Sequence, residues 1–278
     1  WKYSKIFNLD LESLNPSFNS PDDKKTEPSF LDIKDSGLIS INDGWLGNPK
    51  SGDFLDSSQG YLGSLANMGN ELSHIEENFD KPKDFFDCLN RAYNPETLVI
   101  HVPDGVRHES PIYIKIQSVT SGLVACPRIV VNLGENSEVK IVEHHLSGNA
   151  VSLSVPVLDV HVGQNSRLKH CVIQDLGEET WQVSKQNFEL EKNSYVEMFT
   201  AAFGGDYARS EIRCNLKGRG SEAYSAAAYF GTKEQTLDFR TFQKHEAPDT
   251  TSKLLFKGAL DEDSRSIYSG LIKVLPEA

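Results

Sequence analysis

The sequence lacks long hydrophobic runs and has no excess of basic residues. No stretch of 18 consecutive apolar residues occurs, so we expect no segment to cross a membrane as a helix. The chain holds 28 Lys and Arg against 40 Asp and Glu, which gives a formal net charge of −12. Non-specific binding of nucleic acid needs a basic surface, so neither a membrane nor a nucleic acid is an expected partner.

Cysteine is scarce, and several motifs of catalysis are absent. The four cysteines are Cys88, Cys126, Cys171 and Cys214, and no two of them form the C-x-x-C pattern typical of zinc or cluster cages. We therefore expect all four to be structural, in a protein of a reducing compartment. The sequence contains no nucleophile elbow, P-loop or dinucleotide-binding glycine motif, so no enzyme of these classes is indicated.

The chain also lacks an initiator methionine and a visible signal peptide, and it opens on Trp1. We interpret it as a fragment of a longer protein, so targeting information upstream stays an open question. At 278 residues it is long enough to bury a large core, either as one elongated domain or as one domain with a cap.

What the sequence does contain is a repeated turn. Four short segments end in serine at intervals of 29, 28 and 27 residues: 134–137, 163–166, 191–194 and 218–221. A fifth candidate, Asp261–Ser264, follows only after 43 residues, and we attribute this gap to an interruption by the polar stretch Asp238–Pro248. A regular period of this length predicts one supersecondary unit stacked on copies of itself.

Around each turn, apolar residues alternate with polar ones. Val131 and Leu133 precede the first turn, and Val139 and Ile141 follow it. A period of two predicts strands with one buried face, and Asn or Gly supplies the left-handed backbone of the turns. The sequence therefore predicts a mainly β solenoid of about 28 residues per coil, with Val160 and Cys214 pointing inward.

The N-terminal third differs in character. We divide the chain into an N-terminal irregular and helical region (1–95) and a β-helix core (96–278). Residues 15–60 are rich in turn formers and predict irregular surface structure. Two short helices are expected, one with an apolar stripe from Leu62 to Leu72 and one that begins at Pro82 and ends at Asn94. We expect this helical part to cover the open end of the first coil, whereas the far end after Val274 has no cap in this sequence.

Few polar residues suggest a site. His144 and His145 are adjacent and should point to opposite faces of a strand, so they cannot chelate one metal together. His170 should stack near Ile141 of the preceding coil; a polar site there and strand-filling histidine are both open, and the second is favoured. His245 is the candidate polar residue of the stretch Asp238–Pro248; a functional role and a hydrogen-bonded structural role are both open, and the structural role is favoured.

The C-terminal part carries a resemblance to a known family. The run from His245 through Ser252 leads into 257–260 and then 264–274, and it resembles the core signature of the SufB/SufD family of iron–sulfur cluster assembly proteins. Trp1-Lys2-Tyr3 and the stretch from Asn94 to Ile112 resemble the SufD branch more than the SufB branch. The signature residues are His245, Pro248, Ser252, Gly258, Arg265 and Gly270.

The resemblance implies a right-handed parallel β-helix with a small N-terminal helical cap and a C-terminal helical domain, which is absent from this sequence. It also implies a non-enzymatic scaffold that works in a SufB–SufC–SufD complex with SufB-like subunits and a SufC-like ATPase, or that pairs as a homodimer. The family's Cys-x-x-His segment has no match here, so we expect no cofactor in this fragment and an iron–sulfur cluster only at a junction with a partner. The implied location is the cytoplasm, or the plastid stroma in a eukaryote.

Two other readings of a β-solenoid stay open at this point. A secreted polysaccharide lyase or hydrolase would need Asp and Glu columns along a groove, which the repeats do not show. A purely structural solenoid, such as a filament or an adhesin, would assemble with itself and need no SufB-like or SufC-like partner.

Overall fold

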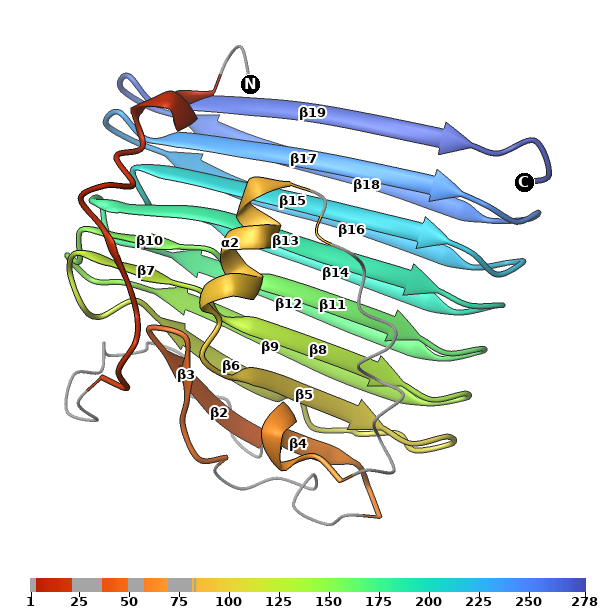
Figure 1. The fold of residues 1–278 in the computed structure, drawn as a ribbon. Helices are drawn as coiled ribbons and strands as arrows, with labels where there is room; N and C mark the ends of the chain where they lie inside the picture. Colours follow the sequence, from red (N-terminus) through yellow and green to blue (C-terminus); the bar gives the residue numbers. More distant parts are fainter. Residues whose placement is uncertain (1–3, 22–36, 50–57, 70–81, 83) are drawn as a thin grey trace.

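The computed structural model describes residues 4–21, 37–49, 58–69, 82 and 84–278. These residues form a parallel β-solenoid in which two sheets face each other along the whole stack (Figure 1). Sheet A contains β1 (Asn15–Pro16), β4 (Tyr61–Ser64), β5 (Thr97–Val102), β7 (Leu123–Ala125), β8 (Arg128–Leu133), β10 (Ser152–Ser154), β11 (Val157–Val162), β13 (Thr180–Leu190), β15 (Tyr207–Leu216), β17 (Thr236–His245) and β19 (Arg265–Val274). Sheet B contains β2 (Gly37–Asn42), β3 (Trp45–Leu46), β6 (Ile112–Gln117), β9 (Glu138–Leu146), β12 (Arg167–Asp175), β14 (Tyr195–Ala202), β16 (Glu222–Gly231) and β18 (Thr251–Leu260). The described helical segments are η1 (Lys5–Asn8), η3 (Leu65–Asn67) and α2 (Phe85–Tyr93).

Successive coils stack in register, as the repeat predicts. Val160 of β11 lies between Val131 of β8 and Phe188 of β13, and Leu168 of β12 lies between Val139 and Val196 in the other sheet. Pairing between these strands is parallel throughout, so each coil donates its backbone hydrogen bonds to the next. The predicted β-solenoid with about 28 residues per coil is confirmed.

The repeated turns form a column along one edge of the stack. Asn136, Asn165 and Asn193 have φ angles of 57°, 58° and 54°, the left-handed conformation that Asn tolerates better than most residues. Their side-chain amides also form a ladder: Asn165 donates to Asn136 at 3.1 Å, and Asn193 donates to Asn165 at 3.2 Å. The turn therefore contributes both its backbone shape and a bond between coils.

The expected interruption of the repeat is wrong. Residues Asp238–His245 lie in β17, which pairs in unbroken parallel register with β15. The fifth turn of the column contains Pro248 and Asp249, because the Gly220 amide donates to Pro248 O and Asp249 has a φ of 62°. Asp261–Ser264 belongs to the opposite edge, where the Arg265 amide donates to Gln235 O. The 43-residue gap arose because turns from two different edges look alike in sequence.

The core lies between the two sheets. Inward residues of both sheets make one apolar cluster, in which Val160 is 3% exposed and Cys214 is fully buried. Burying a side chain of this size stabilises the fold by about 1.5–3 kcal/mol. The predicted inward positions of both residues are confirmed.

The N-terminal region is more ordered than the sequence suggests. Residues Gly37–Asn42 were expected to be irregular, but they form β2, which pairs in parallel with β6. The first expected helix is also wrong over its described part: Tyr61–Ser64 is strand β4, and only Leu65–Asn67 is a short 3₁₀ turn. Leu72 and Trp1-Lys2-Tyr3 lie outside the described residues. The second helix is confirmed as α2, which ends before Asn94 as expected, but it begins at Phe85 after the N-cap Asp84 and not at Pro82.

The helix does not cover the open end of the first coil. That end is covered by the antiparallel strands β3 and β4, which pair with β2 and β5. Instead, α2 lies across the outer face of sheet A (Figure 1). Its Phe86 belongs to the same buried apolar cluster as Val183 of β13. None of the described helices is long and apolar enough to span a membrane.

Candidate functional site

Three polar assemblies in the described residues are candidates for a site. The first surrounds His245 at the end of β17. Its Nδ1 lies 2.7 Å from Thr250 Oγ1, and its Nε2 lies 3.0 Å from Ser252 Oγ. Burial lowers the pKa of His245, which favours the neutral ring with one donor and one acceptor nitrogen. The histidine therefore links β17 to β18 across the turn.

The other signature residues follow this histidine in the chain. Pro248 lies in the turn between His245, which ends β17, and Ser252 of β18, whereas Gly258 lies farther along β18 and Arg265 and Gly270 lie in β19. A Cβ on Gly258 would come within 1.9 Å of Cε2 of Tyr229, so only glycine fits beside that ring. Three signature residues thus meet at one turn, and the rest of the signature is spread over the last coil.

The second assembly lies inside the solenoid, between the two sheets. Glu143 of β9 accepts hydrogen bonds from His170 Nε2 at 2.7 Å and from His145 Nε2 at 3.0 Å. His145 Nδ1 lies 3.1 Å from Nε2 of Gln182, which comes from sheet A. All four residues are buried, so the cluster is a closed polar layer within an apolar core.

The electrostatics of this layer favour an ionised carboxylate. Burial alone would raise the pKa of Glu143, but the hydrogen bonds from His145 and His170 outweigh it and lower the pKa to about 2. The bonds hold Glu143 in place, and the surrounding burial separates it from solvent. Chemically, the layer can fix the register of β9, β12 and β13; it is not presented to a substrate.

The sequence pointed to two members of this layer, His145 and His170, and gave no prediction for the other two, Glu143 and Gln182. His144 and His145 do point to opposite faces: His144 Nδ1 lies 2.8 Å from the Tyr113 hydroxyl on the outer face. His170 does stack beside Ile141. Glu143 was missed, although it follows Val139 and Ile141 at the inward spacing of two, and that spacing was the available signal.

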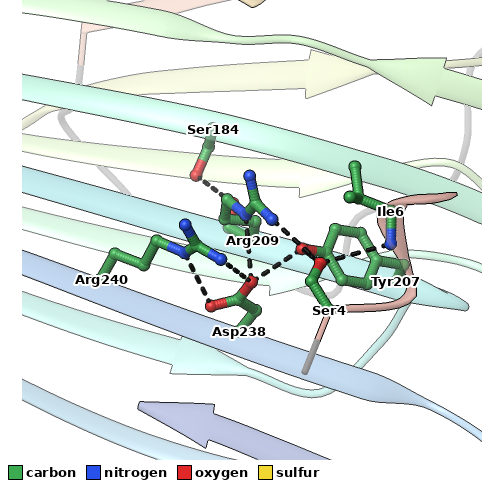
Figure 2. Close-up of polar contacts among 7 residues, drawn as sticks. All are labelled: Ser4, Ile6, Ser184, Tyr207, Arg209, Asp238 and Arg240. Atoms are coloured by element: carbon green, nitrogen blue, oxygen red, sulfur yellow. Dashed lines mark hydrogen bonds and ion pairs between the residues drawn. The ribbon is translucent and has the colours of Figure 1, made fainter. Parts of the chain in front are cut away.

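The third assembly fastens the N-terminal segment to the outer face of sheet A (Figure 2). Asp238, fully buried, accepts hydrogen bonds from the Tyr207 hydroxyl at 2.8 Å and from Arg209 Nε at 3.1 Å. Arg240 adds two more bonds, at 3.2 and 3.1 Å. Ser4 Oγ completes the network: it lies 2.8 Å from Tyr207 Oη and accepts from Arg209 at 3.0 Å.

This network stabilises a contact between distant parts of the chain. Burial, and then the nearby Asp238 carboxylate, raise the pKa of Tyr207 to about 12, so its hydroxyl keeps the proton that it donates. Lys5 adds an ion pair to Asp206 at 2.5 Å. Asp238 and Arg240 lie two residues apart on one strand face, so their pairing is local, whereas Ser4 was missed because its partners Tyr207 and Arg209 are 203 and 205 positions away.

The cysteines do not form a reactive group. All four are free thiols, and burial raises the pKa of Cys126 and of Cys214 to about 12. Burial and the Glu143 charge raise the pKa of Cys171. Such thiols stay protonated at neutral pH and are poor metal ligands. Among the described residues, no three His, Cys, Asp or Glu side chains converge in a way that would hold a metal ion.

A cavity of about 450 Å³ lies along the turn column and is lined in part by Asp104, Glu135, His161 and Glu191. Asp104 Oδ1 already accepts from the backbone amide of Glu135 at 2.7 Å, so this carboxylate serves the turn. The cavity carries acidic side chains, and its Asp104 carboxylate is occupied by the turn.

Residues 116–278 match the sequence model of a family described as SUF system FeS cluster assembly, SufBD core domain. The chain is 27% identical over 224 residues to the chloroplastic protein ABCI7 of Arabidopsis thaliana. This alignment covers 77% of the chain and 47% of ABCI7. It is 28% identical over 175 residues to an iron–sulfur cluster assembly SufBD family protein of Mycobacterium bovis, covering 63% of this chain and 43% of the relative. It is 25% identical over 191 residues to the iron–sulfur cluster assembly protein SufB of Bacillus subtilis, covering 67% of this chain and 41% of SufB.

The chain thus spans less than half the length of each of these relatives. The matched region begins within β6 and takes in every later coil, including the turn that His245 closes.

Proposed function

Because the chain belongs to the SufBD core domain family of the SUF system for iron–sulfur cluster assembly, we propose that it is a non-enzymatic scaffold subunit of a SufB–SufC–SufD type complex. The observation that carries the proposal is the family match over residues 116–278, which coincides with the in-register stack of coils. We assign the chain to the SufD branch, with SufB-like and SufC-like subunits as partners and the cytoplasm or plastid stroma as its location. The division into an N-terminal region (1–95) and a β-helix core (96–278) is part of the same proposal.

The stack suits a scaffold because each coil is bonded to the next along its whole length. Parallel strands in unbroken register, such as β13, β15 and β17, are joined by evenly spaced hydrogen bonds along their length. A rigid body of this kind passes the motion of an ATPase partner to whatever is attached at its other side. We assign it this role rather than one in bond-making chemistry.

The iron–sulfur cluster is the cargo in this proposal, and its ligands are expected outside this chain or at a junction. Cys126 and Cys214 have pKa values raised to about 12, so neither offers a thiolate at neutral pH. Thiolates from the partner subunit would therefore hold the cluster at the junction.

We place the junction with the SufB-like partner on β19. On the outer face of this strand, Leu271 is 56% exposed and lies beside Phe242 of β17. A small apolar patch of this kind on an outer sheet face is suited to contact a partner. A homodimer through the same strand is the alternative assembly.

The experiment is co-purification of the full-length protein with SufB-like and SufC-like proteins of its own organism. We expect a stable complex with both, weakened by Leu271→Ser while thermal unfolding of the isolated subunit stays the same. Val151→Ser, which is 50% exposed and lies outside β19, is the matched control. Failure to retain either partner would contradict the proposal, and cleavage of polysaccharides by the pure protein would support the lyase reading instead. Filaments formed without partners would support the purely structural solenoid.

A further inference from the structure

The outer face of sheet B carries an apolar column that runs from β9 to β18, the last strand of this sheet. Val142, Cys171, Phe199, Ala226 and Leu255 lie side by side on five consecutive strands. Phe199 is 42% exposed and Leu255 is 57% exposed, so large apolar side chains face solvent here. We call these five residues the sheet B column. Apolar side chains in contiguous rows mark binding surfaces more often than isolated ones do.

The two sheets differ in what covers them. On the outer face of sheet A, α2 and the N-terminal segment pack over the strands (Figure 1). Within the described residues, no helix packs over the sheet B column. The fold therefore contains its own example of how a helix lies on one of these sheets.

That example has a specific chemistry. Helix α2 places Phe86 among the apolar side chains of the sheet, and it directs Asp84 and Asp87 at Lys185 of β13. The two carboxylates lie 2.5 and 2.9 Å from Lys185 Nζ. An apolar stripe with acidic neighbours thus matches a sheet face with apolar side chains and a lysine.

Sheet B offers the same combination. In the register column next to the sheet B column, three of the five residues are Lys140, Lys169 and Lys253, and the others are Glu197 and Tyr224. Lys169 is more than half exposed and lies 3.6 Å from Glu197, a distance that leaves a weak surface pair. A lysine-rich row in a chain of net charge −12 favours an acidic partner.

We propose that the sheet B column is a docking site for an amphipathic α-helix of another polypeptide, with an apolar stripe on the column and acidic residues facing Lys140, Lys169 and Lys253. Strands β12, β14 and β16 are hydrogen-bonded on both sides, so a partner cannot add a strand here and packs by side chains. Five strands span about 19 Å, which corresponds to roughly 13 residues of helix. This surface lies on the opposite sheet from β19. Binding at the sheet B column can therefore be tested independently of the junction proposed above.

The test uses the full-length protein and a labelled synthetic helical peptide of about 14 residues with a Leu and Phe stripe and glutamates along one flank. The comparison peptide has lysines in place of the glutamates. Measured by fluorescence anisotropy, the acidic peptide should bind at least about tenfold more tightly than the basic one. Phe199→Ser should weaken binding about tenfold or more, whereas Phe7→Ser, a more exposed phenylalanine elsewhere, should leave it unchanged.

Charge reversal sharpens the test. The double variant Lys169→Glu and Lys253→Glu should invert the preference and bind the basic peptide more tightly. Equal binding of both peptides, no binding of either, or no effect of Phe199→Ser would overturn the proposal.

Two other outcomes would also overturn it. A dimer seen by sedimentation and dissolved by Phe199→Ser would mean that a second copy of the chain covers the column. Binding to vesicles of phosphatidylcholine and phosphatidylglycerol, lost in the same variant, would mean that the column contacts a membrane. Thermal unfolding of each variant shows that the fold is retained.

Discussion

Glu143 accepts a 2.7 Å hydrogen bond from Nε2 of His170, which lies on the next coil inside the solenoid. Both side chains are buried, and the bond crosses from β9 to β12. Since an unpaired buried charge is costly, a slip of these two strands by one residue would break the pair and expose its apolar neighbours. The pair therefore makes one register of the coils much more stable than its alternatives.

We expect Glu143→Gln to destabilise the protein in a pH-dependent way. The pKa of Glu143 is lowered from 4.5 to about 2 in the folded state, so its contribution is fully present above about pH 4.5 and is lost as the pH falls towards 2. The shift corresponds to roughly 3 kcal/mol at neutral pH. Urea unfolding of both proteins between pH 3 and 7 measures the difference, which should shrink as the pH falls.

Glu135→Gln is the matched control for this variant, because Glu135 is exposed in a turn. It should change stability by less than about 0.5 kcal/mol. A Glu143→Gln difference that stays constant over the same pH range would show that ionised Glu143 does not stabilise the fold.

Val160→Asp should destabilise the protein by several kcal/mol, or prevent folding, because it places an unpaired carboxylate in the core. Val151→Asp is the control, since Val151 is 50% exposed and should tolerate the change. The midpoint of urea unfolding and the yield of folded protein are the measurements. Equal stability of the two variants would mean that Val160 does not face the core.

Asp238→Asn should loosen the N-terminal segment. The change weakens the bonds from Tyr207, Arg209 and Arg240 and leaves Arg209, which is 3% exposed, without its charge partner. Loss of a buried partner costs about 3–5 kcal/mol. Hydrogen exchange should show faster exchange in η1, together with a lower global stability.

The control for this variant is Asp249→Asn, since the pair of Arg219 with Asp249 is well exposed and Asn suits the backbone there. Its cost should stay below about 1 kcal/mol. If amides of η1 exchanged at the same rate in Asp238→Asn and in the parent protein, the network in Figure 2 would not hold the segment.

Asn165→Ala should lower the free energy of unfolding by about 1–2 kcal/mol. Alanine is strained at the left-handed φ of 58°, and the change also removes one rung of the amide ladder. Asn165→Gly keeps the backbone free of strain and loses only the ladder, so it should cost less than alanine does. Thermal and urea unfolding of the two variants separate the two effects. An equal loss of stability in Asn165→Ala and Asn165→Gly would mean that the amide ladder, and not backbone strain, accounts for the whole effect.

The stacked coils were predictable from sequence because their signals are local. A turn with Asn or Gly, flanked by residues alternating between apolar and polar, predicts a strand, a turn and a strand wherever it occurs. The position of Val160 between Val131 and Phe188 follows from the repeat length alone. Helix α2 was predicted for a similar reason, since its apolar spacing and its end at Asn94 are local features.

The errors came from features that do not depend on local sequence. The turn at Asp261 resembles those at Asn136 and Asn165, and only pairing between coils shows that it lies on the opposite edge. Strand β2 is short and surrounded by turn formers, and it is stabilised by pairing with β6. Glu143 and Asp238 were difficult for the same reason, because their stabilising partners come from other coils.

The contact of Ser4 with Tyr207 joins residues separated by 203 positions along the chain. During synthesis from the N-terminus, the segment that contains Ser4 leaves the ribosome long before β15 and β17 exist. At about 5–20 residues per second, roughly 10–40 s pass before its binding surface is made. The N-terminal segment therefore cannot dock until β15 and β17 have formed. Its docking is expected to be one of the last steps in folding of these coils.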